Sequence, residues 1–276
     1  MERAEAAAAK ALALDPSLAE AHNALGIVRF LLEWKWAEAE RSFQRALELN
    51  PGLAQARSWY GLELVALGRL EEATKQVQTA LELDPFEPIY SQLLGVLYHF
   101  AGDDERAFAQ LEETLVRFPV TAGAASRTAI ADTYQTLGMM NCEHGRFERG
   151  FEMLKKMQEL SADAADRLAP MAYGLVLAGR TEEARQLLGQ MEARSKTEFV
   201  PPTSFALVYA VLGDEDEAFG WLERAYEGHW VTLPFLLAAW PPFDPLRKDP
   251  RFDDLLRRMG LPRAGAQTGK VPTRES

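Results

Sequence analysis

Apolar residues along this chain recur at helical spacing, and short segments with glycine, proline or charged residues separate them. The segment LEEATKQVQTALELD, residues 70–84, has acidic residues in its first turn and a proline directly after it. Because residues three and four apart share one face of a helix, its apolar positions predict an amphipathic helix. The preceding segment AQARSWYGLELVAL, residues 54–67, predicts a second helix, which Gly68 ends in the left-handed conformation.

These helical pairs repeat with a fixed period. Gly68 and Gly102 are 34 residues apart, and after a gap of 43 residues Gly145, Gly179 and Gly213 follow at the same spacing. Each of these glycines has a small residue seven positions before it and an apolar residue nine positions after it. One helical pair cannot bury its apolar face alone, so the period predicts a stack of pairs. The predicted units are 19–52, 53–86, 87–120, 131–164, 165–198 and 199–232.

The repeated positions resemble those of the tetratricopeptide repeat (TPR). The matching residues are Leu25-Gly26, Leu94-Gly95 with Tyr98, Leu137-Gly138, Ala39 with Phe43, and the closing prolines Pro16, Pro51, Pro85 and Pro119. The aromatic residue that usually opens the first helix is mostly absent in this chain. The resemblance implies an all-α fold, an α-solenoid of tandem helix–turn–helix repeats wound as a right-handed superhelix. It also implies that the first helices line a concave surface, on which partner peptides lie.

Three segments are similar to the C-terminal TPR region of bacterial multidomain signalling proteins. They are EWKWAEAERSFQRALELNP (33–51), ARSWYGLELVALGRLEEA (56–73) and FDPLRKDPRFDDLLRRMGLP (243–262). In those proteins the array follows a winged-helix regulator domain, a nucleotide cyclase domain or a serine/threonine kinase domain. The resemblance implies a regulatory or scaffolding role, and it does not transfer the activity of any such domain.

The segments outside the period predict a further organisation. Residues 1–15 are predicted to be the second helix of a truncated repeat, so this chain is either the C-terminal part of a longer protein or has its N-terminal edge covered by a partner. The insertion at 120–130 forms either a longer loop or an early start of the next helix, and its small and hydroxylic residues favour the loop. Residues 233–262 are predicted to be a helical cap, in which Phe252, Leu255, Leu256 and Met259 share one face, and 263–276 a disordered tail.

Trp34 and Trp36 lie in the corner of the first full unit, which holds one inserted residue and has Glu33 in place of the usual glycine. Two indoles so close in sequence could form a ligand-stacking box, or they could pack at a helix corner. Residues two apart on a helix or turn point in different directions. We therefore expect hydrophobic packing that fills the opening between this unit and its neighbours.

Composition and charge narrow the possible functions. The net charge of −11 disfavours nucleic acid and anionic membranes as direct partners, and no apolar run is long enough to span a bilayer. We therefore expect a cytoplasmic protein. We expect no metal or cofactor, because the four histidines are scattered and Cys142 is the single cysteine. The run Cys142-Glu143-His144 is interpreted as structural, since adjacent helical residues diverge by about 100° and cannot form a catalytic dyad. We therefore expect no enzyme activity.

The candidate binding site is the concave groove. Residues transferred from the family pattern could line it or belong to the core, and none of them is Lys or Arg. This disfavours recognition of an acidic C-terminal carboxylate and favours an apolar or amphipathic helical segment. The leading hypothesis is a protein–protein interaction scaffold; self-association through the N-terminal edge and an enzyme on a helical-repeat scaffold are the alternatives. The candidate residues are Asn23, Ile27, Phe30, Ser58, Leu62, Val65, Gln92, Val96, His99, Gln135, Met139 and Tyr173.

Overall fold

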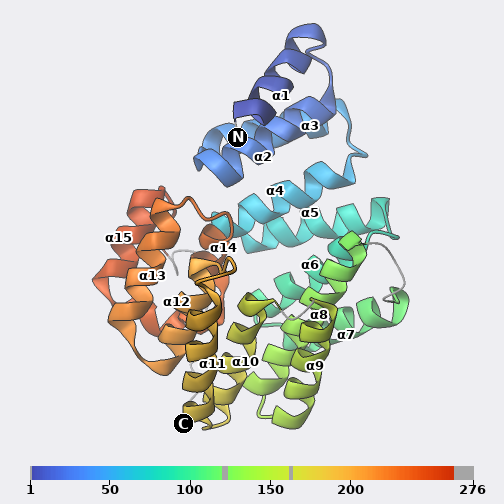
Figure 1. Ribbon diagram of the computed structural model, residues 1–276. Helices are drawn as coiled ribbons and strands as arrows, with labels where there is room; N and C mark the ends of the chain where they lie inside the picture. Colours follow the sequence, from blue (N-terminus) through green and yellow to red (C-terminus); the bar gives the residue numbers. More distant parts are fainter. Residues whose placement is uncertain (1, 120–123, 162–163, 264–276) are drawn as a thin grey trace.

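The computed structural model describes residues 2–119, 124–161 and 164–263, and the helical pairs follow one another around a curved path (Figure 1). The all-α fold is confirmed, since no strand occurs within these ranges. Helix α1 (Glu2–Leu14) precedes the pairs, and α14 (Leu233–Ala239), the 3₁₀ segment η3 (Pro241–Lys248) and α15 (Pro250–Met259) follow them. The pairs are α2 (Ala19–Val28) with α3 (Trp36–Leu49), α4 (Ala54–Ala66) with α5 (Leu70–Leu83), α6 (Pro88–Phe100) with α7 (Asp104–Arg117), α8 (Ala124–Glu143) with α9 (Phe147–Leu160), α10 (Leu168–Leu177) with α11 (Thr181–Arg194), and α12 (Pro202–Leu212) with α13 (Glu215–Glu227).

The periodic glycines end the first helices of five pairs in the predicted conformation. Gly68, Gly102, Gly145, Gly179 and Gly213 all have φ between +72° and +80°. At Gly102 the backbone N–H donates to the carbonyl of His99, and the next N–H donates to the carbonyl of Tyr98. Carbonyl groups at the end of the helix are thereby satisfied while the chain reverses.

The small and the apolar periodic positions meet each other across each pair. A Cβ atom on Gly95 would lie 2.5 Å from Cγ of Leu111, and one on Gly61 would lie 2.7 Å from Cγ2 of Val77. The missing side chain of the first helix therefore makes room for the apolar side chain of the second helix. This contact explains why both positions recur with the period of the glycines.

The first pair accommodates its inserted residue in a π-helical turn. This segment, η1 (Arg29–Glu33), extends α2, and the N–H groups of Trp34 and Lys35 both donate to the carbonyl of Arg29. Single-residue insertions into helices characteristically form such turns. Trp34 then takes the left-handed conformation, with φ of +52°, that glycine takes in the other corners.

The insertion at 120–130, before the fourth pair, does not form the favoured loop over residues 124–130. Residues 124–130 belong to α8, so the alternative of an early helix start holds for them, and residues 120–123 lie outside the described residues. Alanine is the strongest helix former, and the four alanines between 124 and 131 outweigh the hydroxylic residues among them. The predicted disordered tail lies outside the described residues from 264 onward.

The C-terminal cap buries the predicted face. Phe252, Leu255, Leu256 and Met259 are each no more than 2% exposed. Pro250 opens α15, and the Asp249 side chain accepts the N–H of Arg251 at 2.8 Å, as expected of an N-cap residue. Pro245 lies within η3.

The C-terminal end returns to the first two pairs, where α14 packs against α4 (Figure 1). The indole N–H of Trp36 donates to the carbonyl of Met259 at 2.7 Å, and Trp34 stacks on His229 with 4.4 Å between ring centroids. Phe30 meets Phe235 edge to face. We call these three contacts the seam. The predicted packing role of the tryptophans is thus confirmed, but their partners belong to the far end of the chain as well as to neighbouring units.

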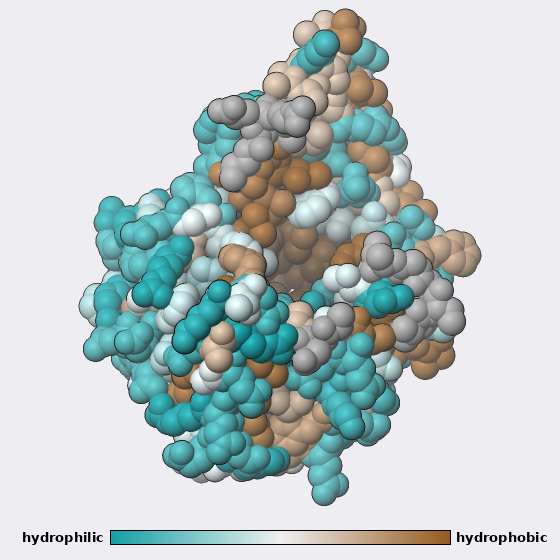
Figure 2. Space-filling view, in the orientation of Figure 1, coloured by the Kyte–Doolittle hydropathy of each residue, from teal (hydrophilic) through white to brown (hydrophobic). Residues whose placement is uncertain are grey.

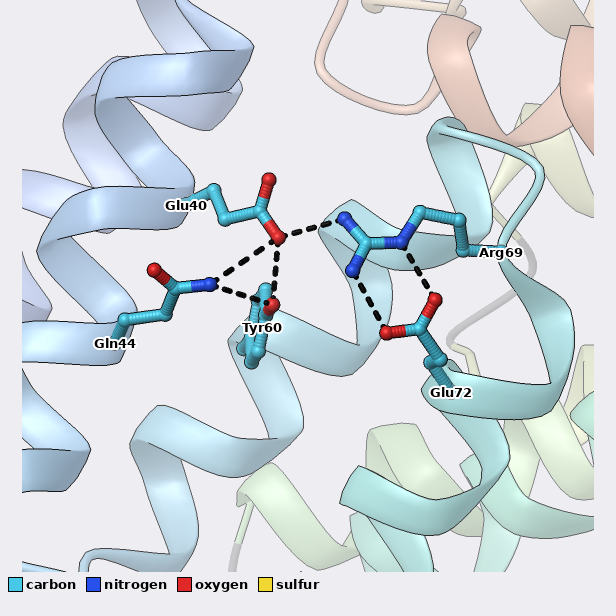
Figure 3. A network of polar contacts seen from close by, with 5 residues as sticks. All are labelled: Glu40, Gln44, Tyr60, Arg69 and Glu72. Carbon is cyan, nitrogen blue, oxygen red and sulfur yellow. Dashed lines mark hydrogen bonds and ion pairs between the residues drawn. The ribbon is translucent and has the colours of Figure 1, made fainter.

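A polar network ties the first pair to the second (Figure 3). The carboxylate of Glu40 on α3 accepts the hydroxyl of Tyr60 on α4 at 2.7 Å and the guanidinium of Arg69 at 2.6 Å. Arg69 also forms a bidentate pair with Glu72. Desolvation and the bond to Glu40 raise the pKa of Tyr60 to about 12.

Beside this network a carboxyl group is fully buried in α4. Glu63 is 0% exposed, and neither of its carboxyl oxygens meets a hydrogen-bond donor among the described residues. Burial raises its pKa from 4.5 to about 8, the nearby charge of Glu40 adds to this effect, and Arg69 opposes it. The equivalent positions of the other pairs, two residues after the periodic small residue, hold Val28, Leu97, Met140, Gly174 and Val208.

Candidate functional site

The candidate groove residues all lie on the first helices of the pairs or, for Phe30, on the extension η1. Five are partly exposed: Ile27, Leu62, Val96, His99 and Gln135. Seven are buried: Asn23, Phe30, Ser58, Val65, Gln92, Met139 and Tyr173. These seven residues therefore belong to the core, which was the alternative to lining the groove, and they contribute little accessible surface to it.

Contacts within the chain account for the burial of this group in the first two pairs. The Asn23 side chain donates to Gln55 at 3.2 Å. Phe30 is enclosed by Trp36 and by Phe235 of α14. Helix α14 packs against α4, the helix that carries Val65. The return of the C-terminal end to this surface is a long-range feature, so the sequence pattern of a single unit carried no signal of it.

Figure 2 shows a hollow between the N-terminal helices and the rest of the chain, with hydrophobic residues on its walls. Hydrophilic residues cover most of the outer surface in the same view. A concave, apolar surface surrounded by hydrophilic residues is typical of a site that takes an apolar segment.

A chain of polar side chains crosses from the third pair to the fourth and fifth. Asp104 lies between two histidines: its Oδ1 is 2.9 Å from Nδ1 of His99, and its Oδ2 is 3.2 Å from Nε2 of His144. Nε2 of His99 is 3.5 Å from Glu143, which accepts the hydroxyl of Tyr173 at 2.8 Å. Sequence reasoning missed this cluster, because the histidines are 45 residues apart and meet only when the pairs stack.

The environment of this cluster perturbs its acidic groups. Burial raises the pKa of Glu143, and burial together with Glu143 raises the pKa of Tyr173. Each member already has a partner within the chain, which makes the cluster a rigid polar link between three pairs. Within the ranges that the structure describes, no group of three or more His, Cys, Asp and Glu side chains has an arrangement that could hold a metal ion.

Cys142 has the environment of a packing residue. It is 2% exposed, and burial raises the pKa of its thiol to about 11. Reactive cysteines require the opposite, a lowered pKa and access to solvent. The adjacent Glu143 and His144 join the polar cluster, and neither is within hydrogen-bond distance of the sulfur in the contacts of the described residues.

Comparison with known families identifies the repeat type. The Tetratricopeptide repeat family matches residues 30–97, and the PPR repeat family matches residues 132–161 and 171–195. No curated protein matches the sequence. The two matches place helix–turn–helix repeats in both halves of the chain.

Solved structures support the same architecture. The chain is similar to a chain of the APC/C hetero-tetramer Cut9-Hcn1, with a TM-score of 0.63 and 15% identity over 93% of this chain and 45% of that one. A tetratricopeptide repeat protein from Parabacteroides merdae gives a TM-score of 0.62 and 13% identity, over 93% of this chain and 91% of that one. PilF of Pseudomonas aeruginosa gives 0.54 and 17%, over 79% and 95%. The chain is therefore an α-solenoid of TPR/PPR-type repeats, and it spans less than half of the chain that it matches in the Cut9-Hcn1 complex.

None of the helices in the described ranges is both long and apolar enough to cross a bilayer.

Proposed function

We propose that this chain is a non-catalytic scaffold that binds a segment of another protein on its concave surface. The observation that carries the proposal is the apolar hollow within a hydrophilic outer surface, together with the partly exposed Ile27, Leu62 and Val96 on successive first helices. An apolar or amphipathic helix is the segment that fits such a surface. The partly exposed Gln135, whose side-chain oxygen accepts from Arg167, offers its amide N–H to the same segment.

The resemblance of three segments to arrays in bacterial signalling proteins supports a regulatory or sensory role within such a system, in the cytoplasm. In this role the array receives a partner segment and transmits the binding event to other domains or proteins. The chain binds its partner and catalyses no reaction on it. The polar cluster around Asp104 holds the first helices of three pairs in register.

The test uses Val96→Glu with Val116→Glu as its matched control. Val96 lies on a first helix and is partly exposed, whereas Val116 on the second helix α7 is 86% exposed. After affinity capture and mass spectrometry have identified a partner, its binding segment is titrated against both variants by calorimetry. We expect Val96→Glu to weaken binding by about tenfold or more, since a buried charge opposes an apolar contact, and Val116→Glu to bind as the unmodified chain does.

Equal binding by both variants contradicts a site on this surface. Val65 is unsuitable for the test, because it is 2% exposed and a carboxylate there would disrupt the fold itself.

Self-association through α1 is a second candidate, favoured by Leu14, which is 81% exposed at the end of that helix. Native mass spectrometry of the chain and of Leu14→Glu tests it. A dimer that Leu14→Glu converts to monomer supports this candidate, and a monomer at all concentrations contradicts it.

A further inference from the structure

Helix α14 lies on the surface that the repeat pattern assigns to partner segments. Its side chains Leu233 and Leu237 are fully buried, and its main packing partner is α4, the first helix of the second pair. Phe235 stands edge to face against Phe30, with 5.4 Å between ring centroids. A short apolar helix of the chain itself therefore occupies the groove of the first two pairs.

This helix has little intrinsic stability of its own. It spans only seven residues, begins at Thr232 without a side-chain cap, and runs into a proline-rich 3₁₀ segment. A helix of fewer than about 12 residues does not persist in water without tertiary contacts. Helix α14 therefore stays helical because the surface of α4 and Phe30 holds it.

The seam that brings α14 to this surface consists of few contacts. Trp36 contributes one hydrogen bond to the carbonyl of Met259, and Trp34 contributes its stack on His229. Both tryptophans are partly exposed, so they reach solvent at the rim of the contact. Detachment of α14 breaks these contacts and its packing against α4, whereas the packing between the two helices of each pair does not involve α14.

From these observations we propose that α14 is an intrachain ligand of the groove formed by α2, η1 and α4, and that a partner helix with an aromatic residue followed by leucines displaces it. The proposal rests on the proposed function in assuming that the concave surface binds partner helices. It adds that the partner helix resembles the sequence Leu-Pro-Phe-Leu-Leu, residues 233–237, in its apolar side chains. It also adds a regulation, since this part of the groove is closed until the seam opens.

The test supplies α14 in trans to the full chain. The probe is a fluorescein-labelled peptide of residues 232–240, flanked by lysines for solubility, and its binding is followed by fluorescence anisotropy. Phe235→Asp in the protein places a carboxylate against Phe30 and dislodges α14. Phe86→Asp is the matched control, because the same change is made at a side chain that is 81% exposed.

We expect the peptide to bind Phe235→Asp about tenfold or more tightly than it binds the unmodified chain or Phe86→Asp. A peptide with aspartate in place of its own phenylalanine should bind none of them. Equal affinity for Phe235→Asp and the control overturns the proposal, as does absence of binding to a Phe235→Asp chain with unchanged circular dichroism.

If Phe235→Asp loses helicity, Trp36→Phe decides the question. This variant removes the N–H that the carbonyl of Met259 accepts, together with the pyrrole part of the indole, and keeps an aromatic ring at the position. Faster hydrogen exchange in α14 and tighter peptide binding support the proposal, and unchanged values of both overturn it. The outcome is independent of the Val96→Glu experiment, which concerns the third pair, so a failure of one proposal can be told from a failure of the other.

Discussion

The buried carboxyl group of Glu63 makes the stability of the chain depend on pH. Its pKa is 4.5 in the ordinary environment and about 8 in the fold, so the folded chain holds this proton more tightly than the unfolded chain does. The resulting stabilisation is complete below pH 4.5 and is lost as pH rises through about 8. Each pKa unit corresponds to about 1.4 kcal/mol, so the whole interval corresponds to about 5 kcal/mol.

The perturbation is Glu63→Gln, which removes the titrating group at almost unchanged volume. The unfolding free energies of both proteins are measured in urea from about pH 5 to about pH 9. All other titrating groups are common to the two proteins, so the difference between them isolates Glu63. We expect this difference to move in favour of the variant by about 1.4 kcal/mol per pH unit up to about pH 8. The buried amide adds an offset that does not change with pH.

Glu71→Gln is the matched control, since the Glu71 side chain is 85% exposed on the neighbouring helix α5. Its profile should run parallel to that of the unmodified chain. Unfolding is followed by circular dichroism and by tryptophan fluorescence, because repeat proteins can lose units in steps. Parallel profiles of Glu63→Gln and the unmodified chain would refute the reasoning. The further variant Glu63→Met, which supplies the residue of the α8 pair, should raise stability at neutral pH.

Further predictions concern the repeat contacts and the cysteine. Gly102→Ala should lower the unfolding free energy by about 1 kcal/mol, because φ is +74° and a side chain disfavours this conformation. A Cβ there meets nothing within 4 Å, so no clash adds to this cost. Gly95→Ala should cost about 1–3 kcal/mol, since its Cβ would lie 2.5 Å from Leu111 Cγ; combined with Leu111→Ala, the loss should be smaller than the sum of the two. Gly189→Ala, inside α11 with free space around it, should raise stability by about 0.5–1 kcal/mol. Urea unfolding checks all three. Burial raises the pKa of Cys142 to about 11, so a thiol reagent at about pH 8 should label it slowly in the native chain and quickly in urea.

The local features of the fold could be predicted from the sequence because they depend on residues close together in the chain. The glycine period gave the helix ends, and the contact of Gly95 with Leu111 explains the two other periodic positions. The four apolar residues of α15 were buried as their spacing predicted. In each case the helix period and a short turn fix the geometry, so a single unit contains all the information needed.

The features that could not be predicted depend on how curvature accumulates over several pairs. The sequence locates the inserted residue beside Trp34, but neither the π-helical turn nor the stack on His229 follows from that position. Phe30 appeared as a groove residue because its partner, Phe235, is 205 residues away in sequence. The meeting of His99 and His144 at Asp104 likewise requires the register between adjacent pairs, which a sequence pattern leaves undetermined.

The seam also limits how this protein can evolve. An open solenoid can gain or lose a repeat without harm, since each unit contacts only its neighbours and the ends move freely. Here Trp36 reaches Met259 only if the intervening pairs turn the chain through the right angle. Insertion or deletion of one pair would carry α14 and α15 past α4 or leave them short of it. The contacts of the seam therefore fix the number of pairs between α4 and α14 geometrically, as closure fixes the strand number of a β-barrel.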